Sequence, residues 1–170
     1  MDNLVKEELV KKIKKIKMVF TDNDGVLTDT GIYYSEKGEQ LKRYSVRDGM
    51  GFERLRKISK IYTGIITSEN SELIRKRAKK LKVEELYSGI KKKDLVLADI
   101  LQKHSLRREN IAYIGDDVND IEILKLVGFS AAPSDALKQV KDIVDYVCEN
   151  KGGHGAFREF ADLIIELKNK

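Results

Sequence analysis

The 170-residue sequence contains one cysteine, one proline and no tryptophan. A single cysteine, Cys148, cannot form an internal disulfide, so we expect a protein of the reducing cytoplasm. Because Cys148 follows Val144, Tyr146 and Val147, we predict a buried structural thiol rather than a nucleophile. No apolar run approaches the roughly 20 residues of a membrane span, and the N-terminal residues lack the apolar core of a signal peptide. We therefore predict no association with a membrane.

Charge is plentiful but scattered. The chain carries a net charge of +5, has a pI near 9.1 and is 36% charged. This balance favours anionic ligands. The basic residues do not alternate with aromatic side chains on which bases could stack, so we expect no nucleic-acid partner. A hydrophobic fraction of 41% is enough for a real core, and with no linker in sight we predict one domain over residues 1–170.

Short apolar runs alternate with helical patterns along the chain. Buried strands are expected at 18–20, 61–67, 86–90, 111–114 and 129–132, with amphipathic helices between them. Such alternation is typical of βαβ units, so the predicted fold class is α/β, a Rossmann-like, mainly parallel sheet flanked by helices. Residues 32–44 surround Gly38 and predict a short β-hairpin inserted after the first strand. We interpret 46–51 as a loop that opens the next helix.

Polar side chains stand where the first four strands end. Asp22 and Asp24 follow the first strand, project to the same face, and precede Gly25, which permits a sharp turn. An EF-hand loop starting at Asp22 is excluded, because Leu27 stands where its glycine is required. The residues that follow the other strands are Thr67, Lys93, Asp116 and Asp120. Because the carboxyl ends of parallel strands share one edge, all of these side chains should meet at one site.

This set of side chains suits phosphate chemistry. A carboxylate that attacks a phosphate dianion meets repulsion of about 8 kcal/mol at ~4 Å with an effective dielectric near 20. A divalent cation held by Asp22 and Asp116 would cancel that repulsion, and Mg²⁺ prefers such oxygen ligands. Lys93 would add a second positive charge. Asp22 can then act as a covalent nucleophile, with Asp24 as general acid and base.

Three stretches carry a specific resemblance. They are Asp22-x-Asp24-Gly25-Val26-Leu27-Thr28-Asp29, Val46-Arg47-Asp48-Gly49 and the stretch from Gly152 to Glu159; Thr67, Lys93 and Gly115-Asp116-Asp117-x-Asn119-Asp120 complete the pattern. Together they resemble the haloacid dehalogenase superfamily, and in it the group of 3-deoxy-D-manno-octulosonate 8-phosphate phosphatases. That group includes nonulosonate 9-phosphate phosphatases and domains attached to sialate cytidylyltransferases. The resemblance spans about 17–167.

The resemblance implies a role for each matching residue. Asp22 would be nucleophile and metal ligand, Asp24 acid/base and carbonyl ligand of Mg²⁺, and Asp116 the third ligand, with Thr67 and Lys93 holding phosphate. The supporting positions would be Asp117, Asn119 and Asp120. The implied substrate contacts are Arg47, Asp48 and Arg158. The group also implies a homotetramer joined through the hairpin, and a glycine-rich C-terminal stretch that closes over a site.

The spacing of the motifs predicts a fold without a cap domain. Only 37 residues separate Asp29 from Thr67, and 22 separate Lys93 from Asp116. Neither gap has room for a large cap, so a neighbouring subunit or a sizeable substrate must exclude water.

Some positions depart from the group. Asn23 stands where the group has an apolar residue, and Thr30 where it often has glycine, but neither change removes a reacting atom. Glu69 replaces the arginine of the octulosonate enzymes, and with Lys80 eleven residues later it resembles the nine-carbon phosphatases. This pairing favours a nonulosonate 9-phosphate over an octulosonate 8-phosphate.

The leading hypothesis is a Mg²⁺-dependent phosphatase of a phosphorylated 2-keto-3-deoxy sugar acid. The alternative is a non-catalytic oligomerisation or regulatory domain like those of the cytidylyltransferases. A third activity, phosphoryl transfer between sugar positions, is disfavoured because it normally needs a cap.

Overall fold

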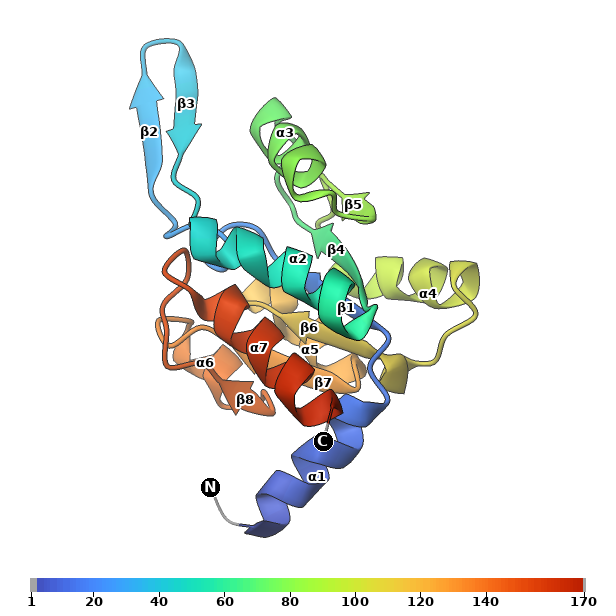
Figure 1. The fold of residues 1–170 in the computed structure, drawn as a ribbon. Helices are drawn as coiled ribbons and strands as arrows, with labels where there is room; N and C mark the ends of the chain where they lie inside the picture. Colours follow the sequence, from blue (N-terminus) through green and yellow to red (C-terminus); the bar gives the residue numbers. More distant parts are fainter. Residues whose placement is uncertain (1–2, 170) are drawn as a thin grey trace.

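The computed structural model describes residues 3–169 as one six-stranded parallel sheet with helices on both faces and a separate antiparallel hairpin (Figure 1). The sheet has the order β5-β4-β1-β6-β7-β8, with β1 Met18–Thr21, β4 Tyr62–Ile66, β5 Glu85–Tyr87, β6 Ile111–Ile114, β7 Phe129–Ala132 and β8 Tyr146–Val147. The hairpin pairs β2 Ile32–Ser35 with β3 Gly38–Lys42. The helices are α1 Asn3–Lys14, α2 Val46–Ser59, α3 Glu72–Leu81, α4 Lys93–Lys103, α5 Ile121–Leu126, α6 Lys138–Lys141 and α7 Ala156–Lys168, with 3-10 turns at Arg108–Asn110 and Val118–Asp120. This arrangement confirms the predicted fold class.

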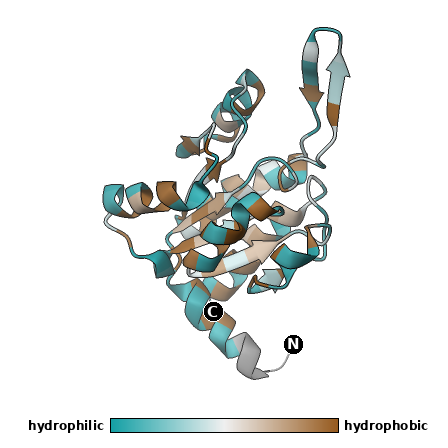
Figure 2. Ribbon diagram, turned by 180° about the vertical axis from the view of Figure 1, so that it is seen from behind, coloured by the Kyte–Doolittle hydropathy of each residue, from teal (hydrophilic) through white to brown (hydrophobic). Residues whose placement is uncertain are grey.

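Strand β1 lies between β4 and β6 and is buried on both faces. Val19 packs into a core cluster shared with α1, α2, α3 and α7, whereas Met18 and Phe20 pack into a second cluster with α4, α5 and α6. Successive side chains of a strand point to opposite faces, so a strand covered on both sides needs a continuous apolar run. Figure 2 shows the result, with hydrophobic strands enclosed by helices whose outer faces are hydrophilic.

Helix α7 packs on α2 through stacked aromatic rings. The ring centroids of Phe52 and Phe157 are 4.2 Å apart, and Phe160 stacks on Phe129 of β7 at 5.4 Å. The apolar stripe of α7 therefore faces the sheet. Cys148 is 2% exposed beside this cluster, which confirms the predicted buried thiol.

Two local predictions were wrong at their boundaries. Residues 46–51 form the first turns of α2 rather than a loop, because the Ser45 side chain accepts hydrogen bonds from the backbone N–H groups of Arg47 and Asp48 and caps the helix. The strand expected at 86–90 spans Glu85–Tyr87 only, since Gly89 has a φ of +76° and turns the chain away from the sheet.

The hairpin projects beyond the sheet (Figure 1). Its base is fixed by Arg43, whose Nη1 donates to Asp29 Oδ2 at 3.1 Å and to the carbonyl of Gly153 at 3.1 Å. Along its two strands it exposes large apolar side chains, namely Ile32, Tyr33, Tyr34 and Leu41. Among the described residues, no helix is both long and apolar enough to cross a membrane.

Candidate active site

The loop that leaves β1 carries the first two acidic residues. Asp22 is 5% exposed, and its backbone N–H donates to the carbonyl of Ile114, which continues the pairing of β1 with β6. Asp22 Oδ1 accepts a hydrogen bond from the backbone of Asn23 at 2.6 Å. The sheet thus fixes the backbone at Asp22, and the following turn fixes the orientation of its carboxylate.

Gly25 allows the acidic loop after β6 to approach this turn. Its φ is +80°, and a Cβ built on it would lie 1.9 Å from Asp116 Oδ2. Any other residue would displace the carboxylate of Asp116 besides adopting a left-handed backbone. The Asp-x-Asp-Gly pattern is therefore explained by the contact between two strand ends, β1 and β6.

A cluster of carboxylates forms where these strands end. Ligand oxygens of Asp22, Asp116 and Asp120 lie within 4.8 Å of one another. Lys93, the first residue of α4, places Nζ 2.7 Å from Asp22 Oδ2 and 2.7 Å from Asp120 Oδ1. The hydroxyl of Tyr113, which sequence analysis missed, donates to Asp120 Oδ1 at 2.6 Å. The predicted convergence of these strand-end residues is what the structure shows.

The cluster carries more negative than positive charge in a buried place. The pKa of Asp22 is raised to about 7, first by burial and then by the charge of Asp120, while Lys93 opposes both effects. Burial also raises the pKa of Asp116 to about 8, with contributions from the charges of Asp22 and Asp120. Like charges held together in a low dielectric must take up a proton or a cation. One lysine does not compensate three carboxylates.

The residues present fit a divalent cation with oxygen ligands. Asp116 Oδ1 is buried and has no hydrogen-bond partner, so it is an acceptor left open toward the cluster. By contrast, Asp120 is engaged through both oxygens, since Oδ1 bonds Lys93 and Tyr113 while Oδ2 accepts from the backbone of Asp116 at 3.1 Å. Each oxygen of Asp22 has a single partner, Asn23 or Lys93, and Asp116 keeps one oxygen open, so Asp22 and Asp116 are the side chains that could hold a metal ion such as Mg²⁺, beside the fully engaged Asp120.

A hollow of about 200 Å³ opens over the carboxylate cluster. It is lined by Asp22, Asp24, Thr30, Ser68, Asp116, Asp117 and Asn119. Asp117 also accepts a hydrogen bond from the N–H of Val118 at 2.6 Å, as expected of an acid at the start of a helical turn. Thr67 is buried beside the hollow, where its Oγ1 accepts from the backbone of Glu69 at 3.1 Å and its own proton stays available to an anion.

Asp24 is held by a residue of the hairpin that the sequence did not reveal. Lys42 Nζ lies 2.9 Å from Asp24 Oδ1 and 3.0 Å from Oδ2, and it also forms an ion pair with Glu69. Burial raises the pKa of Asp24, while the hydrogen bonds from Lys42 oppose that rise. A lysine on a hairpin strand has the usual pattern of a solvated charge, so only the tertiary structure identifies it.

Asn23 explains its own departure from the group's pattern. Its Nδ2 donates to Asp24 Oδ1 at 3.2 Å and lies 3.4 Å from Glu69 Oε2, and its Oδ1 accepts from the hydroxyl of Tyr44 at 3.2 Å. A fully buried amide is tolerated because these partners satisfy it. The polar residue therefore belongs to the network that surrounds Asp24.

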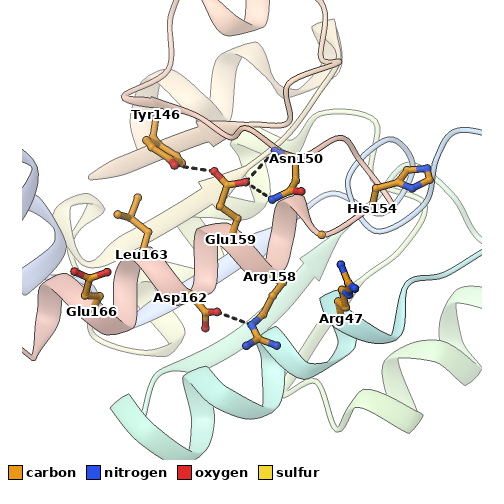
Figure 3. Close-up of a pocket in the computed structure, with 10 residues that line it drawn as sticks. Arg47, Tyr146, Asn150, His154, Arg158, Glu159, Asp162, Leu163 and Glu166 are labelled. Atoms are coloured by element: carbon orange, nitrogen blue, oxygen red, sulfur yellow. Dashed lines mark hydrogen bonds and ion pairs between the residues drawn. The ribbon is translucent and has the colours of Figure 1, made fainter. Parts of the chain in front are cut away.

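The expected substrate contacts, Arg47, Asp48 and Arg158, do not line the hollow over the carboxylate cluster. Arg47 and Arg158 line a larger hollow of about 600 Å³ beside α7, together with His154, and Arg158 Nε bonds Asp162 Oδ2 at 2.6 Å (Figure 3). Asp48 is buried, and its carboxylate accepts from the backbone N–H groups of Gly155 at 3.1 Å and Arg158 at 2.9 Å. Asp48 thus caps the N-terminus of α7.

Glu69 and Lys80 are not brought together within the chain. Glu69 pairs with Lys42, the lysine that also holds Asp24. Lys80 lines a separate hollow between α2 and α3, with Gly49, Glu53, Arg56, Lys57, Leu81 and Lys82.

The fold and the strand-end cluster agree with a known family. Residues 53–160 match the family model of the haloacid dehalogenase-like hydrolases, and the chain belongs to this family of enzymes. A curated relative, the 3-deoxy-D-manno-octulosonate 8-phosphate phosphatase KdsC of Escherichia coli K12, is 37% identical over 166 residues, which cover 98% of this chain and 88% of the relative.

Solved structures give the same result. The 3-deoxy-D-manno-octulosonate 8-phosphate phosphatase from Yersinia pestis superposes with a TM-score of 0.92 at 36% identity, covering 96% of this chain and 88% of that one. The corresponding phosphatase from Moraxella catarrhalis, solved with a magnesium ion, a phosphate ion and a KDO molecule, also has a TM-score of 0.92, at 33% identity, with 96% and 93% covered. The chain therefore groups with the phosphatases of this family.

Proposed function

We propose that this chain is a Mg²⁺-dependent phosphatase that removes the terminal phosphate of a 2-keto-3-deoxy sugar acid, with 3-deoxy-D-manno-octulosonate 8-phosphate as the substrate. The chain is a phosphoric monoester hydrolase by its family. The observation that carries the proposal is that Asp22, Asp116 and Lys93 come together at the strand ends, where the buried Oδ1 of Asp116 has no hydrogen-bond partner. We further propose that residues 1–170 act as one domain, in the cytoplasm.

The first chemical step is attack by the carboxylate of Asp22 on phosphorus. The phosphorus–oxygen bond to the sugar breaks, and Asp24 gives its proton to the departing sugar oxygen. A bound Mg²⁺ held by Asp22 and Asp116, with the Asp24 carbonyl as a further ligand, would neutralise charge on the phosphate. Lys93, whose Nζ lies 2.7 Å from Asp22 Oδ2, contributes a second positive charge, and Thr67 donates its hydroxyl to a phosphate oxygen.

The second step returns the enzyme to its starting state. Asp24, now a carboxylate, takes a proton from water, and the resulting hydroxide attacks phosphorus. The bond between Asp22 and phosphorus breaks, so inorganic phosphate leaves and the carboxylate of Asp22 is restored. Asp120 stays ion-paired with Lys93 throughout and keeps the lysine beside Asp22.

The exposed apolar hairpin supports a homotetramer. Ile32, Tyr33, Tyr34 and Leu41 project from a two-stranded ribbon, and such a ribbon gains stability when another surface covers it. Since no cap domain covers the catalytic hollow, a neighbouring subunit would also help to exclude water. Sedimentation velocity measures the oligomeric state directly, and replacing both Tyr33 and Tyr34 by serine should yield monomers.

The substrate is the eight-carbon ester rather than the nine-carbon one. The curated relatives carry the octulosonate name, and Glu69 and Lys80, the two residues that resemble the nine-carbon phosphatases, do not line one common hollow. Glu69 is occupied by Lys42 instead. Arg47 and Arg158 line a different hollow of this chain, and we propose that they contact the substrate bound to a neighbouring subunit.

Steady-state phosphate release tests the proposal. Octulosonate 8-phosphate and a nonulosonate 9-phosphate are compared with MgCl₂ and with EDTA, for the wild type and Asp22→Asn. We expect Mg²⁺-dependent release that Asp22→Asn abolishes while the circular dichroism spectrum stays unchanged. A preference above about 100-fold in kcat/KM, or about 2.7 kcal/mol, for the nine-carbon ester would reverse the substrate assignment. Unchanged release by Asp22→Asn would refute the covalent mechanism.

A further inference from the structure

Lys42 is unusual among the residues of the hairpin. Its neighbours on β2 and β3 are largely exposed, yet its side chain is only 2% exposed, because it turns inward from the last position of β3 toward the catalytic hollow. A lysine is almost never buried unless it is paired. The partners of the Lys42 ammonium therefore indicate what this side chain does.

The ammonium of Lys42 holds both oxygens of one carboxylate. The distances from Nζ to Asp24 Oδ1 and Oδ2 are 2.9 and 3.0 Å, so the pairing fixes the plane of the carboxylate as well as its position. Two further groups restrain the same oxygen, since Asn23 Nδ2 and Thr28 Oγ1 lie 3.2 and 3.3 Å from Oδ1. The hairpin thus restrains the carboxylate of Asp24, although the Asp24 side chain is 37% exposed.

Lys42 is itself held in place. Glu69, which follows β4, forms an ion pair with Nζ, and Glu39 of the hairpin lies 3.4 Å away. The next residue, Arg43, anchors the base of the hairpin to Asp29 and Gly153. A long, flexible side chain that is fixed at its backbone and its tip can serve as a positioning device.

We propose that Lys42 is a positioning residue for the general acid and base Asp24, through which the hairpin of each subunit forms part of that subunit's own active site. This inference rests on the proposed function. Lys42 keeps its three protons during the reaction, and the only proton that moves is the one exchanged between Asp24, the departing oxygen and water. Because rate depends steeply on the placement of a proton donor, a carboxyl group released from Lys42 should transfer its proton slowly.

The test exploits the leaving group. A sugar alkoxide needs a proton as it departs, whereas the p-nitrophenolate of p-nitrophenyl phosphate leaves without one. The parameter to compare is kcat/KM, since it covers the steps up to departure of the leaving group and omits hydrolysis of the phosphoenzyme. Wild type, Lys42→Met and Lys42→Arg are measured on octulosonate 8-phosphate and on p-nitrophenyl phosphate. Lys37→Met is the matched control, because Lys37 is exposed at the turn of the same hairpin.

We expect Lys42→Met to lower kcat/KM for the sugar ester about 10- to 100-fold and that for p-nitrophenyl phosphate less than about 3-fold. Lys42→Arg should recover a substantial part of the loss, and Lys37→Met should resemble the wild type on both esters. Equal losses on the two esters, or no loss on the sugar ester, would overturn the positioning role. A wild-type enzyme that hydrolyses neither ester would instead refute the proposed function, so the two failures are distinguishable.

Discussion

Lys93 offers a direct test of how the buried charges are balanced. Its side chain is fully buried, and its Nζ lies 2.7 Å from both Asp22 and Asp120. In Lys93→Met the apolar stem is kept and the charge is lost, so two carboxylates remain without their cation. Removing one partner of a buried ion pair destabilises proteins by about 3–5 kcal/mol. For a chain of this length we expect the Tm to fall by roughly 6–20 °C.

The same helix supplies a matched control. Lys103, at the other end of α4, lies 2.7 Å from Glu85 Oε1, the same distance as in the buried pair, but its side chain is 58% exposed. Methionine and lysine have similar helix propensities. Because water screens an exposed pair, Lys103→Met should cost less than about 1 kcal/mol. The two variants therefore differ mainly in the burial of the charge.

The assay is thermal and urea unfolding in EDTA and again in MgCl₂. In EDTA the difference between the variants should be largest. Mg²⁺ should reduce the loss of stability in Lys93→Met, because the metal ion then supplies a positive charge beside Asp22 in place of the lysine. Similar losses in the two variants, or a Lys93→Met protein as stable as the wild type, would show that the carboxylates find another way to lose their charge and would refute this reasoning.

Three further predictions concern the metal, a glycine and a helix cap. Without metal the pKa values of Asp22 and Asp116 are raised to about 7 and 8 from 3.8, so the folded state binds more protons than the unfolded state between about pH 4 and 8 and loses stability as pH rises. Mg²⁺, which competes with these protons, should therefore raise the Tm more near pH 8 than near pH 5.5. An equal rise in Tm at both pH values would contradict this. Gly25→Ala should reduce kcat more than about 100-fold through collision with Asp116, whereas Gly38→Ala, with a φ of +93° and nothing within 4 Å, should suffer only the backbone strain and retain activity. Asp48→Ala should lower the unfolding free energy by about 1–3 kcal/mol, since two backbone N–H groups of α7 lose their acceptor, and a changed KM with unchanged stability would favour the substrate role instead.

The cluster of carboxylates at the strand ends was predictable because the positions of these residues follow from local rules. Asp22 and Asp116 each come directly after a short apolar run, and a parallel sheet brings the ends of its strands to one edge. Gly25 marks the turn between them. No knowledge of side-chain packing was needed for this part of the site.

Other parts depended on contacts that leave no trace in the sequence. Lys42 and Asp24 are 18 positions apart, and neither a period nor a motif links them. Asp48 lies in a conspicuous stretch that suggested a role toward substrate, yet in the fold it caps α7, more than 100 positions later. Lys80 has the right spacing from Glu69 but lies on α3 over a different hollow. Long-range geometry decided each of these cases.

The position of β1 has a consequence for the synthesis of the enzyme. Asp22 and β1 are translated before β4 and β6, with which β1 pairs, and Gly152 is translated later still. A Cβ at Gly152 would lie 1.9 Å from the carbonyl oxygen of Gly25, so this late segment packs directly under the catalytic turn. Because translation is vectorial, a nascent chain carries Asp22, the nucleophile that we propose, before it has the strands and the later segment that hold it. The turn that bears Asp22 and Asp24 is therefore complete only after residues as far along the chain as Gly152 have been made and folded.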